Sequence, residues 1–243
     1  MRKNISLFLF LSAIGCFSQD MEIDPAKINA YVTPFYNSAG PEADIGKYSK
    51  GLVSKTEETF LKTIKEMKQN WQKLSVEELF VGAICLYDHA YRDESVYWFY
   101  TAQLRARALN AGMDQSKAGG VGSTAFEILS VQNSFYQLTG PYINGYAFRD
   151  TNKLAETLKR VKSDGIPNLQ LIYTQIAFIP DKEREAAYKQ VLDGMNGFIE
   201  YLQKEKESIK KQRIDSGASK QFDSLENKEL PSIPRGHTPA IDN

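Results

Sequence analysis

Apolar residues recur at helical spacing in residues 75–109, and the rest of the chain is organised around this stretch. The recurrence begins after Ser75, which with Glu78 three residues later forms a capping box, a pattern that pairs two backbone donors at a helix start. Intervals of three or four residues are the period of one helix face. We therefore predict a helix whose buried face carries Phe80, Ile84, Tyr87 and Tyr91.

A second helix is predicted after the polar turn at residues 92–95. It carries four aromatic residues in succession: Tyr97, Trp98, Phe99 and Tyr100. Because an α-helix has about 3.6 residues per turn, four consecutive aromatic residues place rings on every side of it. We expect this helix to be enclosed by its neighbours.

Three further segments show a helical period, and each opens with a residue suited to an N-cap. The openings are Ser54 with Glu57, Thr124 with Glu127, and Asp150 or Thr151. Gly140 and Pro141 are expected to end the second of these helices, and Gly165 is expected to end the third.

The last helix is predicted to be long, from Pro180 to Arg213, with acidic residues in its first turn and basic residues in its last. Gly194 and Gly197 indicate close approach to a neighbour, since each costs about 1 kcal/mol relative to alanine. Both odd and even positions of residues 168–179 carry apolar residues, so the segment could be a buried strand or a short buried helix. We prefer the helix. These elements predict an all-α, single-domain bundle of about six helices.

Three other regions lack a helical period. Residues 19–52 hold several prolines and glycines and are predicted to be an irregular segment before the helical domain at 53–214. Residues 113–122 are a glycine-rich connector; an anion cradle is the alternative, but the strand and lysine typical of a phosphate loop are missing from this stretch. Residues 215–243 are predicted to be a disordered tail.

The first residues are typical of an export signal. Two basic residues precede an apolar run at 5–14 that is too short to span a bilayer. Two cleavage interpretations stay open. A lipobox ending at Cys16 makes 1–15 a lipoprotein signal and Cys16 the lipidated residue, whereas cleavage before Gln19 makes 1–18 an ordinary signal peptide. We predict export to the periplasm or outer membrane, with membrane attachment only through an anchor at Cys16.

The composition is that of a globular protein. Of 243 residues, 42% are hydrophobic and 12% aromatic, which is enough for a core. The 30 basic and 30 acidic residues balance, so net charge attracts neither nucleic acid nor anionic lipid. Nucleic acid is therefore not expected as a partner.

Few residues suit catalysis or metal binding. The chain has two histidines, of which His237 lies in the predicted tail, so a histidine metal site or catalytic triad is not expected, and no cofactor is predicted. His89 with Asp93 one turn later is interpreted as a surface pair. Cys85 is interpreted as a packing residue on its helix.

Arg105 is the most specific candidate for binding. A guanidinium enclosed among apolar residues must be paired, because an unpaired buried charge costs several kcal/mol. Two partners stay open for Arg105. One is an internal acid, and the other is a carboxylate on a ligand or partner. The internal candidates are Asp88, Glu127 and Asp150.

Residues 141–149, PYINGYAFR, are predicted to be an irregular aromatic loop, with Asn144 and Gly145 in a tight turn of positive φ. Its rings need burial, so we expect it to cover the aromatic helix, either as a structural lid or as the edge of a recognition pocket. The candidate binding residues are therefore Trp98, Gln103, Arg105, Tyr142, Asn144, Tyr146, Arg149 and Asp150.

Two resemblances accompany these patterns. The helices at 79–91 and 96–109, with small residues where they cross, resemble one tetratricopeptide-type hairpin, although no second copy of the pattern occurs in the chain. The sequences WFYTAQLRAR (98–107) and GPYINGYAFRD (140–150) resemble a family of exported bacterial proteins of unknown function. Neither resemblance implies an activity.

The predicted function follows from the lack of a recognisable catalytic set. We expect an exported, non-catalytic binding protein, an immunity- or adaptor-type module for a protein partner, because aromatic residues and arginine dominate interface energetics. The alternative is a carboxylate-based hydrolase of the cell envelope, which requires a polar cleft with acids of raised pKa.

Overall fold

The structure is a computed structural model that describes residues 24–28 and 46–231. Within these residues every regular element is a helix, and one isolated bridge joins Met113 to Phe178. The all-α prediction is confirmed, and the helix count exceeds six because several short helices were not predicted. The elements are η1 Gly46–Tyr48, α2 Ser49–Leu52, α3 Glu57–Gln69, η2 Trp71–Lys73, α4 Val76–Asp88, α5 Arg92–Gly112, α6 Thr124–Ala147, α7 Thr151–Asp164, α8 Leu169–Ile172, α9 Asp181–Lys204, α10 Lys206–Asp215 and α11 Ala218–Phe222.

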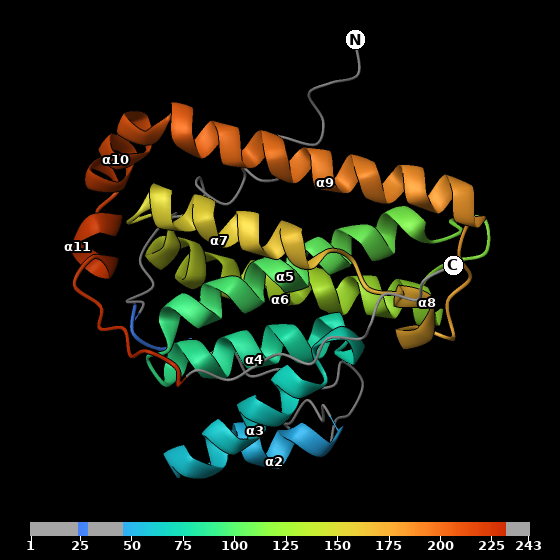
Figure 1. The fold of residues 1–243 in the computed structure, drawn as a ribbon, viewed down its shortest axis with the longest axis horizontal. Helices are drawn as coiled ribbons and strands as arrows, with labels where there is room; N and C mark the ends of the chain where they lie inside the picture. The colour runs from blue at the N-terminus through green and yellow to red at the C-terminus, as the bar shows by residue number, and fades with distance from the viewer. Residues whose placement is uncertain (1–23, 29–45, 232–243) are drawn as a thin grey trace.

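Helix α5 lies at the centre of the bundle. It contacts α4, α6, α7 and α9, and Figure 1 shows α9 running along one side of the molecule while α2 and α3 lie on the opposite side. The aromatic run 97–100 is fully or almost fully buried. The expectation of an enclosed second helix is therefore confirmed.

Helix α4 begins at a local start signal, and a small residue lets it pack closely on α5. The predicted capping box is present: Ser75 Oγ accepts from the Glu78 N–H at 3.1 Å, and Glu78 Oε2 accepts from the Ser75 N–H at 2.8 Å. A Cβ at Gly82 would lie 2.4 Å from Cζ3 of Trp98. Only glycine therefore allows this approach of α4 to the Trp98 ring.

Stacked aromatic rings join α5 to the segment that precedes α4. Trp71 stacks on Tyr97 with ring centroids 5.3 Å apart and meets Trp98 edge-on at 5.0 Å. Each such pair contributes about 0.5–1.5 kcal/mol beyond the area that it buries. These ring contacts therefore hold the segment before α4 in place against this side of α5.

The prediction of an irregular loop at 141–149 is wrong. Helix α6 runs from Thr124 to Ala147, through both Gly140 and Pro141. Proline removes the hydrogen bond to the carbonyl of Gln137 four residues earlier, but Gln137 is exposed, so water can take that place. Gly145 is helical instead of a turn residue, and a Cβ there would lie 2.6 Å from the ring of Phe222.

The predicted long last helix is divided. Helix α9 ends at Lys204, Glu205 interrupts the helix, and α10 begins at Lys206. A Cβ at Gly197 would meet nothing within 4 Å, so the close approach expected there is absent. Residues 168–179 contain only the short helix α8 followed by irregular backbone, so the preferred helix covers only the first part of them.

Two predicted N-caps differ from the structure. Helix α3 begins at Glu57 behind Thr56, without a side-chain cap, because Ser54 Oγ bonds to the Thr56 backbone N–H instead. Helix α6 is capped by Ser123, whose Oγ accepts from the Phe126 N–H at 3.3 Å. The prediction that Asp150 caps a helix is confirmed, since Oδ1 accepts from two backbone N–H groups of α7.

The first part of the predicted tail is ordered. Helix α11 and the residues after it are described as far as Pro231, and Phe222 is 1% exposed against α6. The sequence pattern misses this because α11 is too short for a period to show. Residues 232–243 and the predicted signal at 1–18 lie outside the described residues.

No helix in the described part of the chain is both long enough and apolar enough to span a membrane.

Candidate binding site

Arg105 is buried as predicted but is paired with backbone. It is 1% exposed, and its Nη1 donates to the carbonyls of Trp71 at 3.1 Å and Leu74 at 2.9 Å. Burial lowers the pKa of this guanidinium to about 10, although the phenols of Tyr97 and Tyr173 and the carboxylate of Asp164, an acid that was not among the predicted partners, act in the opposite direction. The expectation of a hydrogen-bonded internal acid is therefore corrected, because two carbonyls hold Arg105.

The acids proposed for Arg105 are engaged elsewhere or exposed. Asp88 Oδ1 accepts from the Ile28 N–H at 2.8 Å, and Asp150 caps α7. Glu127 is exposed in the first turn of α6. Burial leaves Arg105 in a fixed position between η2 and α5, where it joins two segments of the core.

The candidate residues after position 141 mostly make internal contacts. Asn144 Oδ1 accepts from the Tyr100 hydroxyl at 2.9 Å. The Tyr146 hydroxyl donates to Asp93 Oδ1 at 2.9 Å, and the Arg149 guanidinium lies 3.8 Å from the centroid of the Tyr146 ring. The Tyr142 carbonyl is 3.4 Å from the Tyr87 hydroxyl.

The remaining sequence candidates have local partners too. Trp98 Nε1 donates to Glu94 Oε1 at 3.0 Å. His89 stacks on Phe60 with centroids 3.9 Å apart instead of pairing with Asp93, and burial lowers the pKa of its imidazole. Burial raises the pKa of the Cys85 thiol to about 12, which favours the unreactive protonated form. The described residues hold no group of three or more His, Cys, Asp or Glu that could bind a metal.

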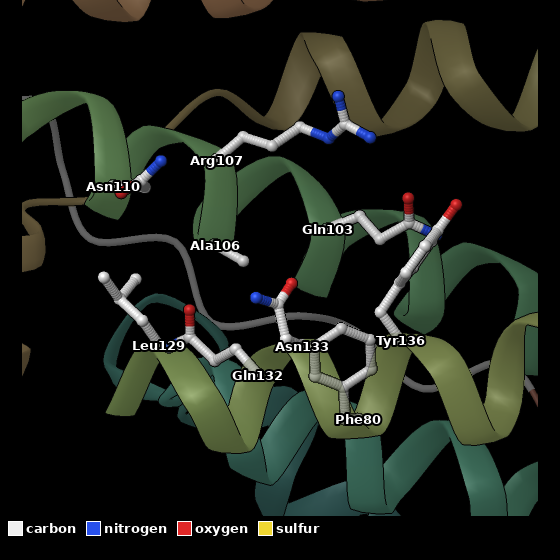
Figure 2. Close-up of a pocket in the computed structure, with 9 residues that line it drawn as sticks. All are labelled: Phe80, Gln103, Ala106, Arg107, Asn110, Leu129, Gln132, Asn133 and Tyr136. Atoms are coloured by element: carbon white, nitrogen blue, oxygen red, sulfur yellow. The ribbon is translucent and has the colours of Figure 1, made fainter. Parts of the chain in front are cut away.

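Gln103 is the candidate that lines a pocket. The pocket lies between α5 and α6 above Phe80 of α4, and its volume is about 240 Å³ (Figure 2). This is slightly below the volume range of drug-sized sites, so it suits a ligand about as large as one amino acid. The lining residues are Phe80, Gln103, Ala106, Arg107, Asn110, Leu129, Gln132, Asn133 and Tyr136.

Helical spacing brings the polar lining together. Gln103, Arg107 and Asn110 stand at intervals of four and three on α5, so they share one face. Figure 2 shows Gln103 and Arg107 leaving α5 on the same side, with Asn133 pointing from α6 toward α5 and Gln132 running along α6 toward Leu129. Polar residues of α5 and α6 thus line the same pocket.

The orientation of the Gln132 amide is fixed by its neighbours. Gln132 Nε2 donates to Glu77 Oε1 at 2.8 Å, and a carboxylate can only accept. Glu77 is held in turn by the Tyr173 hydroxyl, which donates to Oε2 at 2.8 Å. Gln132 Oε1 therefore faces away from Glu77, and it is a buried acceptor without a hydrogen-bond partner in the described structure.

Gln103 presents the complementary orphan group. The residue is 5% exposed, and its Nε2 donor has no partner among the described residues. A buried donor or acceptor left unsatisfied costs about 1–3 kcal/mol. The pocket lining thus includes one residue with an unsatisfied donor on α5 and one with an unsatisfied acceptor on α6.

Arg107 is the one charged residue in the lining of this pocket. Burial lowers the pKa of the Arg107 guanidinium, whereas the phenols of Tyr136 and Tyr100 raise it. An arginine keeps its charge at any physiological pH. The lining therefore combines one cation with neutral amides and a phenol, a set suited to holding an anionic or polar group.

Of the residues in this lining, Gln103 is the one that the sequence predicted as a binding residue. A detectable signal was the coincidence of polar residues at i, i+4 and i+7 on α5 with Gln132, Asn133 and Tyr136 on the next helix. What the sequence could not show is that these two faces oppose each other. That depends on how α5 and α6 pack around Phe80.

Comparison with known proteins yields one distant similarity. No protein-family model matches the chain, and no solved structure matches it either. A Haemophilus influenzae protein, described only as uncharacterised, is 25% identical over 150 residues, which cover 60% of this chain and 54% of that protein. The chain thus spans about half the length of the curated relative it matches. The similarity assigns no activity.

Proposed function

We propose that this chain is a non-catalytic binding protein that engages its partner through the pocket between α5 and α6. The observation that carries the proposal is the pair of buried, unsatisfied amide groups on Gln103 and Gln132, both in the pocket lining. Folding disfavours such groups unless something else uses them. Here a bound partner satisfies both.

The acids with raised pKa favour binding over the hydrolase alternative. Burial raises the pKa of Asp88 to about 6 and also raises the pKa of Glu78. Neither carboxyl lines the pocket, and each accepts a backbone hydrogen bond, Asp88 from Ile28 and Glu78 from Ser75. Both shifts therefore accompany structural roles.

Photo-crosslinking tests the location of the partner. Asn133 lines the pocket and is exposed, so a benzophenone amino acid at this position reaches a bound partner without disturbing the core. In an extract of the bacterial envelope we expect a discrete crosslinked adduct that depends on Gln103. Replacing Gln103 with Met in the same chain should remove it.

The control places the same photoreactive residue at Lys62, an exposed position of α3, which packs on α2. We expect no adduct from this position. Equal crosslinking from positions 62 and 133, or an adduct that persists without Gln103, would rule out the pocket as the binding site.

We also propose that the protein is exported and that it serves a protein partner as an immunity- or adaptor-type module. In this proposal the α4–α5 hairpin acts as a single tetratricopeptide-like unit. The support for export is the signal-like sequence at residues 1–18, with its alternative lipidation site at Cys16. Mass spectrometry of the mature N-terminus distinguishes a lipidated Cys16 from a free Gln19, and a retained Met1 contradicts both.

A further inference from the structure

The polar groups of the pocket between α5 and α6 define the chemistry of its ligand. The pocket lies beside the two orphan groups already described, the Gln103 Nε2 donor and the Gln132 Oε1 acceptor. A ligand that satisfies both must offer an acceptor to α5 and a donor to α6. A water molecule offers both an acceptor and a donor, but it makes no use of the Arg107 charge or of the apolar wall of the pocket.

Arg107 decides which kind of acceptor is favoured. It stands one helical turn after Gln103 on α5 and lines the same pocket. Both residues line the pocket from one face of α5 and carry N–H donors, and hydrogen bonds to an ionised acceptor are roughly twice as strong as neutral ones. The α5 side of the pocket therefore favours an anionic, two-oxygen group.

The α6 side of the pocket requires a donor. Glu77 fixes the Gln132 amide so that Oε1 can only accept, and Glu77 is itself fixed by Tyr173. A second carboxylate oxygen would be repelled at this position, whereas an N–H group would be held. The wall between the two sides is apolar, with Phe80 and Leu129 among its residues.

We propose that the pocket binds a carboxylate whose adjacent carbon carries an N–H group, as in the C-terminal residue of a peptide or in a free amino acid. The carboxylate lies against Gln103 and Arg107, and the N–H donates to Gln132 Oε1. A small side chain faces Phe80 and Leu129. The volume of about 240 Å³ limits the buried part of the ligand to about one residue. This inference rests on the proposed binding function and names the chemical class of its ligand.

Isothermal titration calorimetry on the full chain tests the proposal with four probes. N-acetylalanine carries both groups, and N-acetylalanine methylamide keeps the N–H but has no carboxylate. Alanine represents the free amino acid, and Ala-Ala-Ala represents a peptide end. We expect N-acetylalanine to bind with a Kd of about 1 mM or tighter, and the methylamide to bind at least about tenfold more weakly.

The peptide probes distinguish the two sources of this chemistry. Equal affinity for N-acetylalanine and Ala-Ala-Ala indicates a peptide C-terminus. Tighter binding of alanine than of either indicates a free amino acid. Both results support the proposed carboxylate site, and each identifies the natural source of the ligand.

Variants connect binding to the named groups. Gln103→Met exchanges an amide whose Nε2 has no partner for an apolar side chain of similar size, so we expect the fold to be retained. We expect it and Arg107→Met each to weaken N-acetylalanine binding at least about tenfold. The charge control Lys62→Met removes an exposed cation from α3 and should leave affinity unchanged.

Three results would overturn this inference. They are equal affinity for N-acetylalanine and its methylamide, unchanged affinity in Gln103→Met, and no heat from any probe at about 10 mM. Methylamide binding that depends on Gln103 overturns the carboxylate but supports the proposed binding function. If no probe binds, the photo-crosslinking at position 133 still decides the proposed function separately.

Discussion

Two faces of α5 each carry an arginine, and the two arginines are built into the molecule differently. Arg105 faces η2, where the carbonyls of Trp71 and Leu74 accept its hydrogen bonds and it is 1% exposed. Arg107 is two residues later, which at about 100° per residue places it on nearly the opposite face. There it lines the pocket beside Gln103.

The two faces of α5 differ in role: the Arg105 face contributes to the packed core, whereas the Gln103 face lines the proposed binding pocket. On the Arg105 face, Nη1 of Arg105 donates to two carbonyls and aromatic rings fill the space around it; its Nε has no hydrogen-bond partner, but Arg105 does not line the pocket. On the Gln103 face an amide donor is unsatisfied next to a cavity. Burial of a polar residue is therefore a poor guide to function, whereas an orphan polar atom beside a cavity is informative.

The largest effect is expected from removing Arg105. Arg105→Ala removes a donor from two carbonyls, of which Trp71 keeps a hydrogen bond from the Leu74 N–H at 3.4 Å, and it opens a cavity, so the free energy of unfolding should fall by about 4 kcal/mol. The matched change Arg107→Ala, on the pocket face, should lower the free energy of unfolding by less than half as much. Urea unfolding followed by circular dichroism measures both. Equal losses would mean that the two faces do not differ as described.

Replacing Tyr146 tests whether the C-terminal half of α6 contributes to the packed core and not to binding. Tyr146 is 1% exposed, and its hydroxyl donates to Asp93. Tyr146→Ala should lower the free energy of unfolding by about 3 kcal/mol. Affinity for N-acetylalanine should stay the same in the variant, because Tyr146 does not line the pocket. Lost affinity with unchanged stability would return Tyr146 to the recognition role that the sequence left open.

A smaller effect concerns pH. Burial raises the pKa of Asp88 to about 6, against the opposing charges of Lys27 and Arg92. The folded state then binds a proton more tightly than the unfolded chain, so this carboxyl destabilises the fold increasingly as pH rises from about 4 to about 6. Asp88→Asn keeps the acceptor for the Ile28 N–H and should be more stable than the parent by about 1 kcal/mol at neutral pH.

The gain from Asp88→Asn should vanish near pH 3.5, where both forms are neutral in the folded state. Ligand affinity should not change between pH 5 and about 8, because the pocket is lined by amides, Arg107 and a phenol. Denaturant unfolding and calorimetry at several pH values check both expectations. A gain that is the same at every pH contradicts the role of the Asp88 charge.

The sequence predicted the packed core around α4 and α5 better than it predicted the pocket between α5 and α6. The capping box at Ser75 and the aromatic run at 97–100 are local signals, and α4 and α5 follow them closely. Gly140 and Pro141 are also local signals, but tertiary contacts override them. Residues beyond them gain burial against α5 and α11, with Gly145 against Phe222 as one example.

The site was harder to predict because its defining property is not local. Gln103 was selected for its place on the aromatic helix, and the structure does place it at a cavity. Gln132 is not among the candidate residues that the sequence singles out. Its orientation depends on Glu77 and Tyr173, which lie 55 and 96 residues from their respective hydrogen-bond partners in this network. No pattern along the chain contains such a relation.

The most direct test of the central claim is the stability of Gln103→Met with and without N-acetylalanine. If Gln103 is kept for binding, replacing its unsatisfied amide should leave the free protein as stable as the parent or stabilise it by about 1 kcal/mol. The same variant should lose the increase in the free energy of unfolding that saturating ligand gives the parent. A free variant destabilised by more than about 2 kcal/mol, or one that keeps the full ligand effect, would contradict the account.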